Sequence, residues 1–184
     1  MSARATKTRL RTLDMTYIAL FAVLMAVCAW ISIPAPVPFT LQTFAVSFTL
    51  LALGGRRGSF AILTYLLMGA VGLPVFNGFR GGLGVLLGTS GGYILGFAVM
   101  AVVFRAVTAV KPDSLHLRIA GCLLGLAGCY TFGTAWFMAV YARQSGAVGL
   151  SMALGMCVVP FLLPEGVKLV LAVSLSQRLK KHLH

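Results

Sequence analysis

The stretch MTYIALFAVLMAVCAWISI, residues 15–33, contains no charged side chain. A helix needs about 20 predominantly apolar residues to cross a bilayer, so this stretch is long enough for one crossing. The sequence PAPVP, residues 34–38, follows it directly. Because proline lacks an amide hydrogen and clashes inside a helix, we expect a first transmembrane helix that ends there.

The composition of the whole chain also indicates a membrane protein. Its 184 residues are 59% hydrophobic and 10% charged, with a mean hydropathy of +0.97. Soluble domains carry about 25% charged residues, so the composition argues strongly against a water-soluble domain. The net charge of +12 would suggest nucleic-acid binding in a soluble protein. In this chain it predicts orientation in the bilayer, and we expect no nucleic-acid partner.

Further apolar runs predict an all-α membrane protein with six transmembrane helices in one domain. The expected spans are 15–33, 39–53, 59–73, 93–110, 119–141 and 150–175. A tight turn, GGRRG at 54–58, separates the second and third spans, which are short and need flanking segments to reach full depth. A glycine-rich loop covers about 74–92, and residues 1–14 and 176–184 form basic ends outside the 15–175 core.

The basic side chains divide unequally between the two sides of this bundle. With six spans, both termini lie on one side, and that side holds 12 of the 15 Lys and Arg residues. The other side holds Arg80 and Arg143, and Lys168 falls within the sixth span. Cytoplasmic loops carry the Lys/Arg excess, so we expect both termini in the cytoplasm of a prokaryotic cell, with the chain in its plasma membrane.

Motifs of catalysis and cofactor binding are missing from the sequence. It contains neither GxxxxGK[ST] nor HExxH. The three histidines lie outside the expected spans, and the four cysteines lie within apolar runs without a CxxC pair. We therefore expect no catalytic residues, no metal and no cofactor, and an intramembrane enzyme is disfavoured.

The sixth span carries the one acid of the six expected spans, Glu165, together with Lys168. Glu165 and Lys168 are three positions apart and share one helix face. A charge at membrane depth costs about 2.5–3.5 kcal/mol on insertion scales, and such residues are candidates for function. A purely structural ion pair remains the alternative. Pro160 and Pro164 predict a break between them and a new helix start beside Glu165.

Two other features attract attention. The loop segment FNGFRGGLG, residues 76–84, lies on the outer side and carries Asn77 and Arg80. It fits a cover over an apolar pocket, although a plain connector is the alternative. Small residues recur four apart in Ala22/Ala26, Gly92/Gly96 and Gly121/Gly125. For the glycine pairs we expect internal packing; for the first helix, internal packing and docking of another subunit are equally possible.

Several of these segments together resemble one known family. PVPFTLQT at 36–43, GLPVF at 72–76, GGLGVLLG at 81–88, GGYILGF at 91–97 and the segment with Glu165 and Lys168 are similar to the BioY family. Its members are the biotin-binding S components of energy-coupling factor (ECF) transporters. The likeness covers about 19–172. It departs at Leu163, Pro164 and Glu165, where the family has Pro-Gly-Asp, and at Thr89-Ser90, where it has Pro-Thr.

The resemblance implies a six-helix bundle of the ECF S-component type that binds biotin from outside. It also implies two kinds of partner: a transmembrane coupling subunit, docked on Ala19, Ala22 and Ala26, and two ATP-binding-cassette ATPases. An S component for another vitamin and a stand-alone carrier are the alternatives. Biotin offers a carboxylate, a ureido ring and a thioether ring. We expect its contacts from Glu165, Lys168, Arg80, Tyr93, Gln42, Asn77, Phe39 and Thr40.

Overall fold

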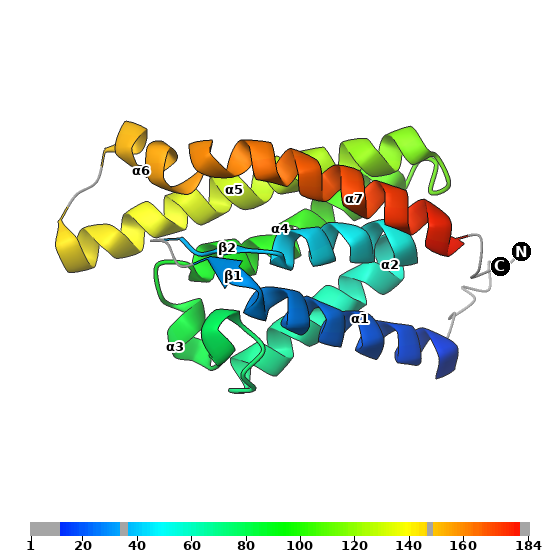
Figure 1. The fold of residues 1–184 in the computed structure, drawn as a ribbon, viewed down its shortest axis with the longest axis horizontal. Coiled ribbons are helices and arrows are strands. Elements are labelled where there is room, and N and C mark those ends of the chain that lie inside the picture. The colour runs from blue at the N-terminus through cyan, green and yellow to red at the C-terminus, as the bar shows by residue number, and fades with distance from the viewer. Residues whose placement is uncertain (1–11, 34–36, 147–148, 181–184) are drawn as a thin grey trace, which may run out of the picture.

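The computed structural model describes residues 12–33, 37–146 and 149–180, and it is mostly helical (Figure 1). Long helices lie roughly side by side along the longest axis of the molecule. The elements are α1 Thr12–Trp30, β1 Ser32–Ile33, β2 Phe39–Thr40, α2 Gln42–Ala70, η1 Asn77–Phe79, α3 Leu83–Leu86, α4 Gly91–Thr108, α5 Leu115–Ser145, α6 Leu150–Cys157, η2 Val159–Phe161 and α7 Leu162–Lys180.

The element α2 is not one straight helix. Gly54 interrupts it with φ 78° and ψ 175°, a conformation that favours glycine. The side chains of Gln42 and Tyr65 form a 2.6 Å hydrogen bond, although residues 23 positions apart in a straight helix are separated by about 35 Å. The chain therefore folds back on itself at Gly54. This geometry agrees with the expected short runs 39–53 and 59–73 around a tight turn.

The last helical region is broken, as the prolines predict, but the break comes earlier than expected. Val158 leaves the helical region with φ −125° and ψ −57°. A short 3₁₀ turn that contains Pro160 follows, and α7 begins at Leu162. Glu165 lies in the first turn of α7, so the predicted position of the acid at a helix start is correct.

Close contact between α4 and α5 depends on glycine. A Cβ on Gly92 would lie 2.2 Å from Trp136, and one on Gly96 would lie 2.7 Å from Cys129 Sγ. From α5, a Cβ on Gly125 would lie 2.8 Å from Met100. Any larger side chain would push the two helices apart. The prediction that the glycine pairs serve internal packing is therefore confirmed.

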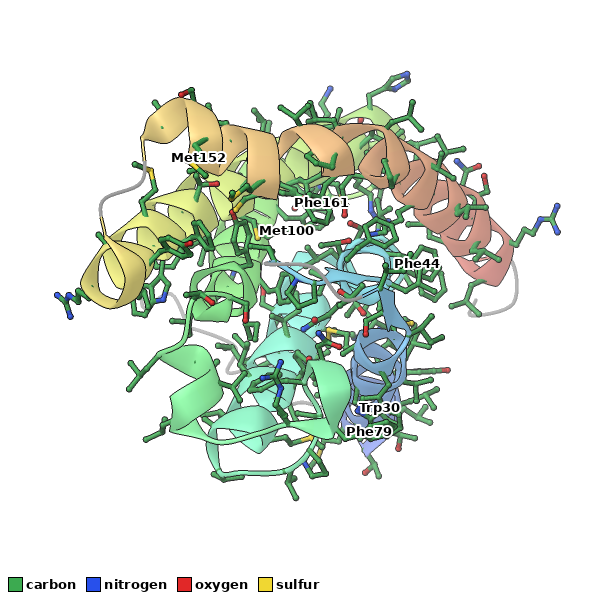
Figure 2. All side chains as sticks on the ribbon, turned by 60° about the vertical axis from the view of Figure 1, so that its left-hand side comes forward. Trp30, Phe44, Phe79, Met100, Met152 and Phe161 are labelled. Carbon is green, nitrogen blue, oxygen red and sulfur yellow. The ribbon has the colours of Figure 1, made fainter. Side chains whose placement is uncertain are left out.

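A small ribbon was not foreseen in the expected all-α fold. β1 and β2 pair antiparallel, with Ser32 opposite Thr40 and Ile33 opposite Phe39. The outer loop is tied beside this ribbon, because Ser32 Oγ donates to Asn77 Oδ1 at 2.6 Å and Trp30 Nε1 donates to Pro74 O at 2.9 Å. Figure 2 shows Trp30 and Phe79 side by side, with ring centroids 4.7 Å apart.

Within the described residues, four helical stretches are long and apolar enough to cross a membrane: Thr12–Trp30, Gly91–Thr108, Leu115–Arg143 and Leu150–Leu179. The two halves of α2 are shorter, at about 18 and 24 Å by helical rise, against about 30 Å of hydrocarbon. In Figure 1, α1 begins and α7 ends at the same end of the molecule. The loop between α2 and α4 lies at the opposite end.

Candidate functional site

A cavity of about 70 Å³ lies where the start of α2, the N-terminal half of α4, the middle of α5 and the start of α7 meet. Its lining combines apolar and polar side chains. The residues are Val37, Pro38, Thr40, Gln42, Thr43, Asn77, Ser90, Tyr93, Ile94, Phe97, Cys129, Tyr130, Cys157, Phe161 and Glu165. Apolar walls with a few polar groups are typical of pockets for small organic ligands.

One wall of this site is formed by Glu165, which is paired with Lys168 on α7. Lys168 Nζ lies 2.7 Å from Glu165 Oε1, and both side chains are more than nine-tenths buried. Thr43 Oγ1 also donates to Glu165 Oε1, at 2.8 Å. Both contacts use the same carboxylate oxygen, while Glu165 lines the cavity. The acid is thus held in place by the protein and remains next to the cavity.

Lys168 has a different position from the one expected of a ligand contact. Its ammonium group donates to Thr40 O at 2.6 Å, to Thr43 Oγ1 at 3.0 Å and to Glu165 Oε1 at 2.7 Å. An ammonium has three hydrogens to donate, and this chain occupies all of them. Lys168 is absent from the cavity lining. It stands behind Glu165 and holds the acid in place, and a direct contact between its ammonium and a ligand stays a prediction.

Of the other expected residues, Gln42, Asn77, Thr40 and Tyr93 line the cavity. The Tyr93 hydroxyl lies 2.9 Å from Thr134 Oγ1. Its ring leaves no room for a Cβ on Gly133, which would be 2.3 Å away. The position of Tyr93 is therefore fixed from both the hydroxyl and the ring.

Phe39 takes a supporting position outside the cavity lining. Its ring centroid lies 4.1 Å from Lys168 Nζ, a cation–π contact. The same ring stacks on Phe161, which does line the cavity, with centroids 5.8 Å apart. Phe39 thus supports both the charged pair and an aromatic wall.

Arg80 does not reach the cavity. It lines a second, more open hollow with Pro38, Gly84, Val85, Gly88, Thr89 and Ser90. Pro38 and Ser90 line both spaces, so the two are neighbours. The Arg80 side chain is exposed and donates from Nε to Asn77 O at 3.3 Å. Direct contact between Arg80 and the Glu165 wall is not observed.

The alanines expected to dock a partner do not share an outer face. Ala22 and Ala26 are 0% and 4% exposed and belong to the core of this chain. Ala19 is exposed. The structure therefore uses Ala22 and Ala26 for internal packing, which corrects the expectation of a docking face built on all three alanines.

Sequence reasoning missed several lining residues. Thr43, which bridges Glu165 and Lys168, lies next to Gln42, but only the tertiary contact reveals its role. Tyr130 and Cys129 come from α5, and Cys157 from α6. These residues lie within ordinary apolar runs, where no local pattern separates a cavity wall from a packed core.

Comparisons with known proteins identify the family of this chain. The family model described as the BioY family matches residues 2–184. The "Biotin transporter BioY" of Thermotoga maritima is 40% identical over 163 residues, 88% of this chain and 92% of that protein. The "Probable biotin transporter BioY" of Pyrococcus horikoshii is 38% identical over 168 residues, 91% of this chain and 96% of that protein.

A solved structure has the same fold. The crystal structure of "the S-component for biotin from an ECF-type ABC transporter" aligns with a TM-score of 0.79. It is 24% identical in sequence and covers 98% of this chain and 95% of that chain. The likeness establishes the shared helical architecture. With a family model over nearly all of its length and relatives at about 40% identity along the same span, the chain belongs to the BioY family.

Proposed function

We propose that this chain binds biotin on the outer side of the membrane and delivers it inward as the S component of an ECF transporter. The observation that carries the proposal is the buried pair of Glu165 and Lys168 at the wall of a cavity with apolar and amide-bearing sides. A buried ion pair is costly unless other groups satisfy it. Here the ion pair places the carboxylate of Glu165, a hydrogen-bond acceptor, next to the cavity, where a ligand with N–H donors can use it.

The chemistry of biotin fits the distribution of polar groups. Its ureido ring has two N–H donors, which suit the carboxylate of Glu165 and the amide of Gln42. Its thioether ring suits the walls formed by Phe97, Ile94 and Phe161. Lys168 is fully engaged, so the valerate carboxylate needs another cation. We place the carboxylate toward Arg80, in the hollow that shares Pro38 and Ser90 with the cavity.

The proposal includes six crossings with both termini in the cytoplasm, since the basic residues cluster on the side of the termini. It also includes a transmembrane coupling subunit and two ATPases as separate chains. The exposed face of α1 that carries Ala19 is the surface on which we expect the coupling subunit. ATP hydrolysis by these partners would drive release inward.

One experiment tests the ligand. The protein is purified from biotin-containing medium and analysed by mass spectrometry, and the stripped protein is titrated calorimetrically with biotin, thiamine, riboflavin and pantothenate. We expect bound biotin in stoichiometric amount and heat from biotin alone. Heat from a different vitamin would instead identify an S component of another specificity and contradict the proposal.

A second experiment tests the partners. Proteoliposomes that contain this chain alone are compared with proteoliposomes that also contain the coupling subunit and the ATPases. We expect uptake of labelled biotin only with the full set and ATP. Equal uptake by the chain alone would identify a stand-alone carrier and remove the ATPases from the proposal.

A further inference from the structure

A chain of hydrogen bonds connects the cavity to the outer loop through a residue that the cavity does not touch. Gln42 Nε2 lies 2.6 Å from the Tyr65 hydroxyl, and that hydroxyl lies 3.1 Å from Val75 O. Tyr65 is fully buried, and Gln42 is 4% exposed. Gln42 lines the cavity, whereas Tyr65 does not.

The direction of these bonds is determined by chemistry. Val75 O is a carbonyl and can only accept, so the hydroxyl hydrogen of Tyr65 is donated to it. The Tyr65 oxygen can then only accept from Gln42, which must turn its NH₂ group toward the tyrosine. The amide oxygen Oε1 is left without a hydrogen-bond partner among the described residues. No fully buried side-chain nitrogen or oxygen among the described residues lacks a partner, so Oε1 is accessible, and a ligand or water in the cavity that Gln42 lines can satisfy it.

The acceptor at the end of the chain is firmly held. The Phe76 ring meets the Tyr65 ring edge-on, with centroids 5.6 Å apart. Phe76 is fully buried against Gly69, where a Cβ would lie 1.9 Å from the ring. Val75 O therefore has a defined position at the base of the outer loop. A tyrosine between a fixed acceptor and an amide acts as an orienting group.

We propose that Tyr65 is a positioning residue that makes Gln42 present its carbonyl oxygen, an acceptor, to the ligand. The site then selects for a ligand with an N–H donor at that point. This inference rests on the proposed function, in which the donor is one of the two ureido N–H groups of biotin. It assigns a role in specificity to a side chain that never touches the ligand.

The test compares the affinities of the wild-type protein and of Tyr65→Phe for three ligands. The ligands are biotin and two analogues, each methylated on a different ureido nitrogen. In the wild type, the analogue that lacks the N–H facing Gln42 should bind about tenfold more weakly than biotin, in line with one hydrogen bond. In Tyr65→Phe, the Gln42 amide is free to turn. We expect biotin to bind about tenfold more weakly there, and the difference between biotin and that analogue to shrink to less than threefold.

Tyr17→Phe is the matched control, because the Tyr17 hydroxyl has no hydrogen bond within the described residues; it should keep wild-type affinities for all three ligands. If Tyr65→Phe weakens biotin and both analogues equally, Tyr65 is only a packing residue and the inference is overturned. Failure of the wild type to bind biotin would instead overturn the proposed function itself, which keeps the two outcomes distinct.

Gln42→Ala provides the test if Tyr65→Phe does not fold. We expect it to lose the discrimination against the same analogue, because the oriented acceptor is gone. In the double variant Gln42→Ala/Tyr65→Phe, the second substitution should change biotin affinity by less than twofold relative to Gln42→Ala. Unchanged discrimination in Gln42→Ala, or a further tenfold loss in a folded double variant, contradicts the inference.

Discussion

Lys168 lies among acceptors from two distant parts of the chain, and this arrangement determines what its removal does. Without the ammonium, Glu165 Oε1 loses its charged donor and keeps Thr43 Oγ1, and Thr40 O loses its side-chain donor. Breaking a buried pair by deleting one partner costs about 3–5 kcal/mol. The carboxylate also loses the group that holds it in place beside the cavity.

Lys168→Ala is therefore expected to lower the thermal unfolding midpoint and to abolish high-affinity biotin binding, as measured by calorimetry in detergent. Lys111→Ala, at an exposed turn, is the control and should change neither. The double variant Glu165→Gln/Lys168→Met should recover stability, because no charge is left unpaired, but it should still not bind. Wild-type affinity in Lys168→Ala would exclude the pair from the site.

Loss of the Arg80 side chain should affect binding but not stability, because this side chain is exposed and its removal leaves no buried group unpaired. If Arg80 meets the valerate carboxylate, Arg80→Ala should weaken biotin about tenfold, because hydrogen bonds to charged groups contribute about 1.5–3 kcal/mol. Biotin amide, which lacks that charge, should bind the variant and the wild type equally. Equal weakening of both ligands would contradict the placement of the carboxylate.

At the level of elements, the contact between α4 and α5 positions Tyr93 and Cys129 on two walls of the cavity. The contact is close because Gly96 meets the backbone of α5 directly: its Cβ would lie 3.1 Å from Cys129 O and 3.2 Å from Cys129 Cα. Backbone atoms of a packed helix cannot move aside individually, so added volume must shift a whole helix.

Gly96→Ala should accordingly destabilise the protein by about 1–3 kcal/mol, the usual cost of overpacking, and weaken biotin binding with it. The measurement is thermal unfolding followed by calorimetric titration. Gly155→Ala is a matched control in α6, because a Cβ there meets nothing within 4 Å. A Gly96→Ala protein as stable as Gly155→Ala would mean that α4 and α5 are not held at this distance.

Helix boundaries show what local patterns predict well. Apolar runs mark α1, α4 and α5 to within a few residues, because partition into a bilayer depends on local composition. The sequence also predicts the turn at Gly54 and the interruption before Glu165. It does not predict Val158 as the start of that interruption, since the prolines that cause it lie further along and the chain adjusts before them.

At the scale of the whole molecule, orientation is the property to test. Val71 and Val110 are both 79% exposed, one beside the outer loop and one after the far end of α4. The four native cysteines are buried, so we expect them to add little to the labelling of an introduced cysteine. With a membrane-impermeant maleimide on intact cells, Val71→Cys should be labelled at once and Val110→Cys only after permeabilisation. The reverse pattern would place the termini outside.

The sequence by itself determined that this protein belongs in a bilayer, where its helices run, which family it resembles and which acid and amine lie in its core. These properties follow from composition and short spacings along the chain. Only the tertiary structure decided that Lys168 stands behind Glu165 and that Arg80 lies in a neighbouring hollow. It alone brought Tyr65 to Gln42 and turned Ala22 and Ala26 inward. The reason is physical: Thr40 and Lys168 are 128 residues apart in sequence, and a contact across that distance depends on how whole helices pack.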